Sequence, residues 1–96
     1  MSDFKELDPL LHQRLRLAIM SMLVATEKAE FKLIKQKTVA TAGNLSIQLR
    51  KLEDAGYLKI DKSFRGNYPL TEVRITGAGQ VAFNTYVTNL QGYLKP

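Results

Sequence analysis

The sequence predicts an α+β fold that is mainly helical, with a helix-turn-helix, one small β-hairpin and a long last helix. Apolar residues recur with the period of a helix before residue 56 and after residue 76. Between these positions, two short segments alternate apolar and polar residues, as half-buried strands do. With 45% hydrophobic and 24% charged residues, the 96 residues suit one domain, near the size at which a partner subunit often adds buried surface.

Composition limits the possible functions. Cysteine is absent, which excludes disulfides and thiolate metal sites, and the first residues lack the layout of a signal peptide, so we expect a cytoplasmic protein. His12 is the only histidine, and neither a glycine loop for phosphate nor a supported Ser/His/Asp set is present. We therefore expect no enzyme, no cofactor and no metal, and no membrane partner.

The first helix is expected to begin at Asp8, as N-cap, and Pro9, at the first helical position. Apolar residues lie on most sides of this helix. They are Leu10, Leu11, Leu15, Leu17, Ala18, Ile19, Met20, Met22 and Leu23. Such a helix has to be covered on several sides. A small domain offers few elements for this, so we expect a second subunit to supply part of the cover.

The helix-turn-helix follows a polar break at residues 27–30. Residues 31–37 form a short amphipathic helix, and the β-branched residues in 38–40 weaken it. Thr41 is a suitable N-cap for a helix over residues 42–55. Gly56 ends that helix at a left-handed position.

The hairpin is predicted from strands at residues 57–62 and 72–75. Between them, residues 64–69 contain glycine, asparagine and proline and form a loop long enough to project from the sheet. We expect Phe64 and Tyr68 to anchor this loop to the sheet.

The last helix, residues 77–94, begins after Thr76 as N-cap. One apolar stripe is widened by further residues, and the set is Phe83, Val87, Leu90 and Leu94 with Ala82, Tyr86 and Tyr93. No residue from 77 to 94 is charged, but six amide and hydroxyl side chains make the segment too polar for a membrane. This pattern indicates a helix at a subunit interface.

The excess of positive charge lies on the helix-turn-helix. Residues 32–52 hold five basic residues and no acid, while the other nine basic residues are matched by nine acids. A basic helix-turn-helix with a hairpin beside it is the arrangement that a winged-helix DNA reader needs.

The outward face of the helix at 42–55 is fixed by Leu45, Leu49 and Leu52, which share one side and must be buried. Asn44 and Gln48 can read adenine, Arg50 or Lys51 can reach guanine or phosphate, and Ile47 can contact a thymine methyl or another protein. Gly43 allows either close approach to a phosphate or close helix packing. The residues that we expect to contact DNA from this helix are Thr41, Ala42, Gly43, Asn44, Ser46, Ile47, Gln48, Arg50 and Lys51.

The hairpin adds a second set of candidate DNA contacts, at residues 62–70 and on the returning strand: Lys62, Arg65, Asn67 and Arg74. The cations could straddle a phosphate backbone, or Arg65 could enter the minor groove, whose negative potential attracts arginine. The alternative is a hairpin that carries ordinary solubilising charge.

Several motifs together resemble small MarR/ArsR-like winged-helix regulators. The segment 41–46 with Leu49 and 52–57 resembles their recognition helix, and 64–66 with Pro69 resembles their wing. Residues 75–79 resemble the entry to their last helix, and 14–19 resemble their first helix.

This resemblance implies a homodimer that binds duplex DNA and regulates transcription, with the recognition helices in successive major grooves; we expect a repressor, with any effector unknown. The first and last helices would hold the dimer through Leu11, Leu15, Ile19, Phe83, Tyr86, Val87, Leu90, Tyr93 and Leu94. The alternative is a winged-helix module that binds another protein.

Overall fold

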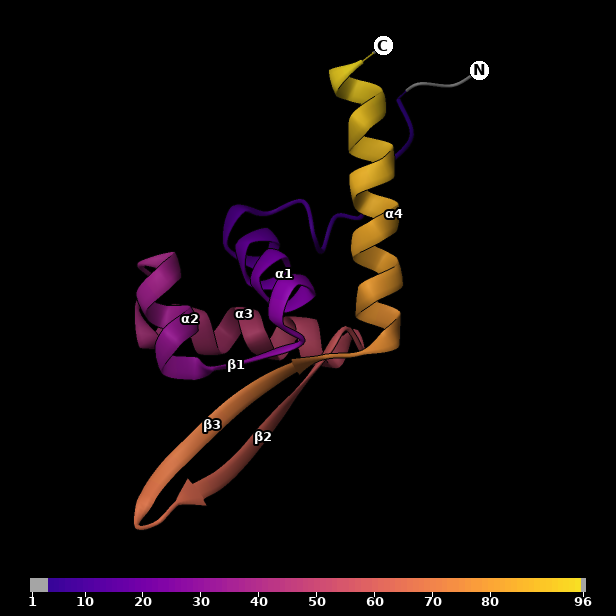
Figure 1. The fold of residues 1–96 in the computed structure, drawn as a ribbon. Coiled ribbons are helices and arrows are strands. Elements are labelled where there is room, and N and C mark those ends of the chain that lie inside the picture. Colours follow the sequence, from indigo (N-terminus) through magenta and orange to yellow (C-terminus); the bar gives the residue numbers. More distant parts are fainter. Residues whose placement is uncertain (1–3, 96) are drawn as a thin grey trace.

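The computed structural model describes residues 4–95 and shows four helices with a three-stranded antiparallel sheet. The elements are α1 (Arg14–Thr26), β1 (Lys28–Glu30), α2 (Phe31–Thr38), α3 (Ala42–Asp54), β2 (Leu58–Arg65), β3 (Tyr68–Ile75) and α4 (Gly77–Leu94). The β2–β3 hairpin projects from one end of the molecule, and α4 extends past α1 at the other (Figure 1). The chain therefore measures 56 × 25 × 21 Å. The predicted α+β fold, a helix-turn-helix with a hairpin wing, is confirmed.

The core surrounds α1, which contacts α2, α3, α4, β1 and β3. Its buried side chains come from every element, and they are Leu11, Leu15, Ile19, Met20, Leu23, Ala29, Ile34, Leu45, Leu49, Leu52, Leu58, Val73 and Tyr86. A helix with apolar residues on most sides needs such cover. The cover comes largely from within the chain.

The prediction that the first helix begins at Asp8 and Pro9 was wrong. Asp8 caps only a single turn, in which its Oδ1 accepts the Leu10 N–H at 2.9 Å and its carbonyl accepts the N–H groups of Leu11 and His12. The helix begins at Arg14, because Gln13 is the N-cap and its Oε1 accepts the Arg16 N–H at 2.8 Å. The sequence contains two capping residues one after the other, Asp8 and Gln13, and the helix begins after the second.

The polar break expected at residues 27–30 is a strand. β1 pairs antiparallel with β3, which gives the sheet order β1-β3-β2, and Ala29 opposite Val73 is the buried pair of this ladder. The prediction missed β1 because three residues with one apolar side chain carry no visible period. Its pairing with β3 is set by a contact distant in the sequence.

The hairpin is longer than predicted. Its strands pair until Arg65 meets Tyr68, so Gly66 and Asn67 alone form the turn in place of a loop over 64–69. Gly66 has a φ of +62°, as the first residue of a tight hairpin turn requires. The ladder continues past the last buried residues, because backbone pairing does not need an apolar face.

α4 is fixed at its first turn. The Thr76 side chain accepts the Gly79 N–H at 3.0 Å, as expected of an N-cap, and its hydroxyl donates to the Gly56 carbonyl. A Cβ built on Gly79 would overlap the Tyr57 carbonyl oxygen, so only glycine fits there. None of the helices among residues 4–95 combines the length and apolarity needed to cross a membrane.

Candidate nucleic-acid interface

The orientation of α3 agrees with its prediction. Leu45, Leu49 and Leu52 are 0–1% exposed. Thr41 caps the helix, with its Oγ1 accepting the Asn44 N–H at 3.2 Å. Polar and basic side chains of the opposite face are open to solvent, and its exposed members are Thr41, Ala42, Gly43, Asn44, Ser46, Ile47, Arg50 and Lys51. The face is positioned by the burial of the leucines behind it.

Gly43 and Ile47 distinguish this face from an ordinary solvated helix surface. A Cβ added at Gly43 would meet no atom within 4 Å among the described residues, which leaves close helix packing inside the chain without support. Ile47 is 56% exposed. The first two turns of α3 thus expose the backbone at Gly43 and one apolar side chain, Ile47, to solvent or to a binding partner.

Gln48 is held by the protein itself. Its Oε1 accepts Arg16 Nη1 at 2.5 Å and its Nε2 donates to Asn44 Oδ1 at 3.0 Å, while Arg16 Nε donates to the Leu10 carbonyl at 2.6 Å. The amide of Gln48 is therefore engaged at both ends, and it serves to orient Asn44. Arg16 was missed as part of the site, since only the folded chain brings it near a residue 32 positions away.

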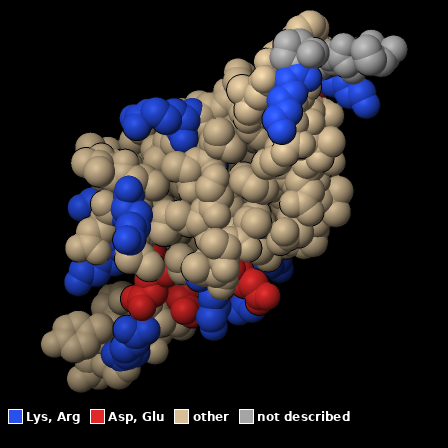
Figure 2. All heavy atoms as spheres, turned by 45° about the horizontal axis from the view of Figure 1, so that its top comes forward, with Lys and Arg blue, Asp and Glu red and all other residues tan. Residues whose placement is uncertain are grey.

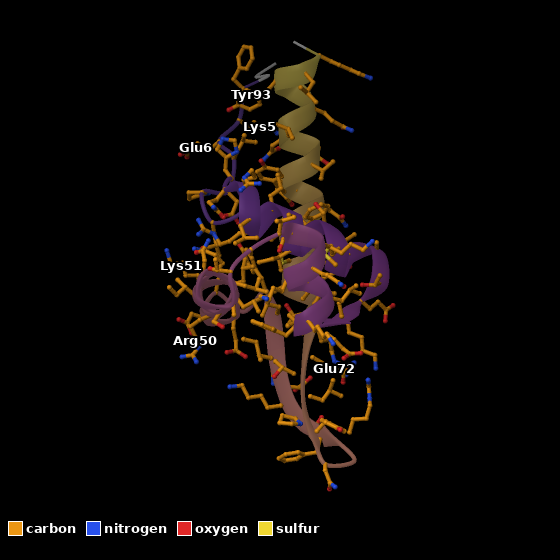
Figure 3. All side chains as sticks on the ribbon, turned by 90° about the vertical axis from the view of Figure 1, so that its left-hand side faces the viewer. Lys5, Glu6, Arg50, Lys51, Glu72 and Tyr93 are labelled. Atoms are coloured by element: carbon orange, nitrogen blue, oxygen red, sulfur yellow. The ribbon has the colours of Figure 1, made fainter. Side chains whose placement is uncertain are left out.

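A groove of about 470 Å³ separates α3 from the hairpin. Arg50 and Ser46 line it from the helix, and Lys62 and Thr71 line it from the strands, over a floor that includes Leu49. Further lining residues are Phe31, Glu53 and Ile60. Arg50 and Lys51 point outward from α3 on one side of the hairpin (Figure 3). Two cations and two hydroxyls along a groove are suited to a phosphate backbone.

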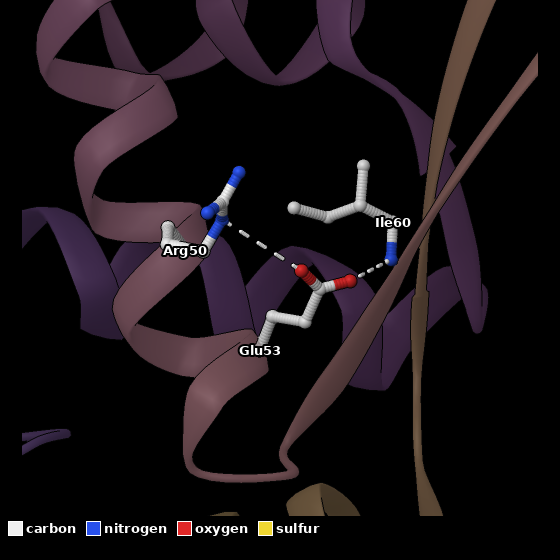
Figure 4. A network of polar contacts seen from close by, with 3 residues as sticks. All are labelled: Arg50, Glu53 and Ile60. Atoms are coloured by element: carbon white, nitrogen blue, oxygen red, sulfur yellow. Dashed lines mark hydrogen bonds and ion pairs between the residues drawn. The ribbon is translucent and has the colours of Figure 1, made fainter.

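Glu53 joins the end of α3 to the base of the hairpin (Figure 4). Its Oε2 accepts the Ile60 N–H at 2.9 Å, and its Oε1 lies 3.9 Å from Arg50 Nε. β2 is an edge strand, so this N–H has no partner in the sheet. Sequence reasoning missed Glu53, because the contact depends on how the strand crosses the helix end.

The hairpin cations lie on two different faces. Lys62 shares the face of Ile60, toward α3, whereas Arg65 and Arg74 belong to the opposite face by the strand alternation. Both arginines have acidic partners, with Arg65 Nη2 3.3 Å from Glu30 and Arg74 Nε 3.9 Å from Asp61. The expected three-cation clamp is therefore not assembled on one side of the wing.

The face turned away from α3 carries like charges in rows. The register aligns Glu30, Glu72 and Asp61 across the three strands, and Lys28, Arg74 and Lys59 form the next row. Figure 2 shows acidic side chains gathered near the base of the hairpin, with basic ones around them. Glu72 lies on the other side of the hairpin from Arg50 and Lys51 (Figure 3). The acid row makes this face a poor one for DNA.

The tip of the hairpin is aromatic and exposed. Phe64 is 72% and Tyr68 is 78% exposed, so the prediction that they anchor a loop to the sheet was wrong. Asn67 stands at the turn and is exposed as well. The extended ladder carries both rings beyond the body, where no side chain of the core can reach them.

The residues predicted for a dimer interface divide by burial. Leu11, Leu15, Ile19 and Tyr86 lie in the core of the chain itself. The remaining five are Val87, Tyr93 and Leu94, which are exposed, and Phe83 and Leu90, which are half-buried. The surface that α4 offers to a partner is thus narrower than the sequence implied.

The N-terminal segment runs along α4. Tyr93 donates to the Lys5 carbonyl at 2.7 Å, its ring meets that of Phe4 edge to face, and His12 Nδ1 lies 2.9 Å from the Tyr86 hydroxyl. Tyr93 and Lys5 are close together at the far end of α4 (Figure 3). His12 is thereby accounted for as a structural contact.

Tyr57 ties this segment to the end of α3. Its hydroxyl donates to Asp8 Oδ2, and this hydrogen bond, with burial and the negative charge of Asp8, raises the pKa of Tyr57 to about 12. Each of these effects disfavours the phenolate. Tyr57 therefore remains a hydrogen-bond donor to high pH.

Comparisons with known proteins agree with this geometry. Residues 15–94 match the family model described as a winged helix DNA-binding domain. An uncharacterized protein of Methanocaldococcus jannaschii is 38% identical over 72 residues, which are 75% of this chain and 78% of that protein.

Solved structures give the same result. A transcriptional regulator homologue from Pyrococcus horikoshii superposes with a TM-score of 0.83 at 32% identity, over 88% of this chain and 84% of that one. A PadR family transcriptional regulator from Eggerthella lenta shares the fold alone, with a TM-score of 0.67 at 17% identity over 84% and 79% of the two chains. The outward α3, the projecting hairpin and the match over residues 15–94 together show that this chain belongs to the family of winged helix DNA-binding domains, a family of DNA readers and not of enzymes.

Proposed function

We propose that the protein is a homodimeric transcriptional regulator that binds duplex DNA in a sequence-specific way and acts as a repressor. The observation that carries this proposal is the exposed face of α3, with Arg50 and Lys51 outward beside a groove that Arg50 and Lys62 line. Similarity to the transcriptional regulator homologue of Pyrococcus horikoshii supports a role in transcription. A cytoplasmic location suits such a protein.

In this proposal α3 enters the major groove with its first turns against the bases. Helix N-termini favour phosphate, and residues near them read base edges. Asn44, oriented by Gln48, and Ile47 face adenine and thymine, while Gly43 allows the backbone to approach closely. A phosphate backbone then passes between Arg50 and Lys62, and the hairpin reaches the next minor groove.

The repressor role is the simplest one for a protein that binds duplex DNA. A bound dimer can lower transcription by occupying a promoter, without any further contact to the transcription machinery.

The test is the salt dependence of duplex binding. A dimer that neutralises about six phosphates loses affinity with a log–log slope of about −5 against salt, and Arg50→Ala with Lys51→Ala lowers this slope to about −2 if both residues contact phosphate in each subunit. The measurement is fluorescence anisotropy with duplexes selected from a random-sequence pool, over a salt series.

The matched control is Lys28→Ala with Lys59→Ala, which removes the same charge from the face turned away from α3. The salt slope of this control should stay close to the wild-type slope and differ from it only by the small effect of the lower net charge. Equal losses in the two double variants would contradict the assignment of α3 as the contact surface.

The second candidate is a module that binds another protein through the same surface. The exposure of Ile47 favours it. Ile47→Ser distinguishes the two functions, because a DNA reader loses preference for its selected sequence but keeps its salt slope. A protein-binding module has no sequence preference to lose.

A further inference from the structure

The tip of the hairpin combines exposure, apolar character and a lack of negative charge. Between residues 62 and 71 there is no acid, and the charged residues are Lys62 and Arg65. Phe64 is 72% exposed and lies directly opposite Pro69, which is exposed too. An exposed phenylalanine ring gains no burial free energy when the chain folds, but it gains that free energy when a partner surface covers it, so the tip is suited to binding.

The arginine of the tip is engaged elsewhere. Arg65 reaches back to Glu30 on β1, at 3.3 Å, and so its charge is partly neutralised on the face turned away from α3. The side of the tip that continues the groove is instead the Phe64–Pro69 pair, because both share the strand face of Ile60, Lys62 and Thr71. Opposite residues of this kind, whose backbone groups do not bond to each other, have closely spaced side chains.

We propose that Phe64 and Pro69 form an apolar wedge that enters the DNA minor groove beside the α3 site, partly unstacks one base step and bends the duplex. The proposal rests on the proposed function. Two observations favour DNA as the occupant. Phe64 and Pro69 are the next pair on the strand face beyond Lys62 and Thr71, which line the α3 groove, and no acid lies between residues 62 and 71. Inserted phenylalanine and proline side chains kink DNA by about 20–90° in proteins that bind the minor groove.

Tyr68 provides a matched control within the same turn. It is 78% exposed, as aromatic as Phe64 and only four residues away, but it belongs to the opposite face of the hairpin with Arg65. The wedge model therefore assigns different effects to two substitutions of similar size. Both side chains are exposed, so neither truncation removes core packing, and equal melting temperatures confirm folding.

The experiment measures bending and unstacking on duplexes selected by the wild-type protein. Energy transfer between dyes at the duplex ends reports the bend, and 2-aminopurine placed at successive steps beside the α3 site reports unstacking. Wild type and Tyr68→Ala shorten the end-to-end distance and raise 2-aminopurine fluorescence at one step. Phe64→Ala binds with the same salt slope but abolishes the fluorescence rise and most of the bend.

Each other outcome rejects the wedge in a recognisable way. If wild type binds the duplex and Phe64→Ala bends it equally, the wedge is wrong while the proposed function stands. If Phe64→Ala instead changes the sedimentation of the free protein, the tip contacts a second copy of the chain. If the protein binds no duplex more tightly than a neutral control protein does, the proposed function is wrong and the wedge is wrong with it.

Discussion

Val39 adopts a backbone conformation that valine rarely takes. It ends α2 with φ 55° and ψ 35°, in the left-handed region, and its side chain is 90% exposed. A β-branched residue there is strained, at a cost of about 1–2 kcal/mol. The strain sits in the turn of the helix-turn-helix, between three lysines of α2 and the cap of α3.

Val39→Gly is expected to raise the free energy of unfolding by about 1 kcal/mol, because the relief of strain exceeds the added entropy of the unfolded chain. Almost no packing is lost at a side chain this exposed. Urea unfolding of wild type, Val39→Gly and Val39→Ala measures the effect, and the alanine variant gains less since it retains a Cβ. A glycine variant less stable than wild type would show that the valine makes a contact worth more than its strain.

Tyr57 makes stability depend on alkaline pH. Its pKa is raised from 10.0 to about 12 in the folded protein, so its contribution is fully present below pH 10 and is lost as the pH rises through 12. Tyr57→Phe lacks this contribution throughout. The difference in unfolding free energy between wild type and Tyr57→Phe should therefore shrink between pH 10 and 12.

Chemical denaturation at stepped pH measures this difference. Tyr68→Phe, which removes a hydroxyl from the exposed tip, is the control for the chemical change. A constant difference between wild type and Tyr57→Phe across that range would show that the hydrogen bond to Asp8 does not govern the titration.

Residues whose role is local were predictable. Thr41, Thr76 and Gly56 cap helices through atoms within a few positions, and each does so as predicted. The residue type of Gln48 suits contact with a base, but its amide is hydrogen-bonded to Arg16 from another helix. The sequence could not predict this hydrogen bond, because it depends on how the two helices pack together.

Glu53 connects α3 to the hairpin. Its carboxylate accepts an edge N–H of β2 and also lies beside Arg50, so it attaches the base of the hairpin to α3 and adds negative charge to the groove. These two roles oppose each other in DNA binding. They are separable by substitution.

Glu53→Gln keeps an acceptor for the Ile60 N–H and removes the charge, so duplex affinity should rise by up to about fivefold, equivalent to about 1 kcal/mol. Glu53→Ala loses the acceptor, and the Ile60 amide should exchange faster with solvent. Anisotropy and amide exchange by NMR measure the two effects. The prediction fails if Gln and Ala variants exchange alike at Ile60.

At the scale of elements, long periodic segments were predictable and paired ones were not. α2, α3 and α4 fall within one residue of the predicted ranges, because each carries its own apolar stripe. β1 and the outer half of the hairpin exist through backbone pairing with β3, which leaves little trace in side chains. The exposed aromatic tip follows from that missed extension.

In the whole molecule, one apolar stripe of α4 remains partly open. Val87 and Leu94 are exposed on the stripe with Phe83 and Leu90, which pack partly against the core. In the proposed dimer Val87 becomes buried. An aspartate there would place an unpaired charge in the interface.

Val87→Asp is therefore expected to yield monomers at concentrations where wild type is dimeric, with the helical content unchanged. Sedimentation velocity with circular dichroism measures both. Thr88→Asp, an equally charged change at the next residue and turned about 100° from the stripe, should remain dimeric. A dimeric Val87→Asp protein would move the interface away from this stripe.

In the proposed dimer, the close contact at Gly79 would limit how far the two α3 helices can move relative to each other. A Cβ on Gly79 would overlap the Tyr57 carbonyl oxygen, and Thr76 donates to the Gly56 carbonyl, so α4 begins in close contact with the turn that follows α3. A dimer that associates through α4 would then keep its two α3 helices at a nearly fixed separation. Such a dimer could bind two half-sites that lie a few base pairs further apart only by distorting the DNA between them. We therefore expect its affinity to fall steeply when the half-site spacing is changed.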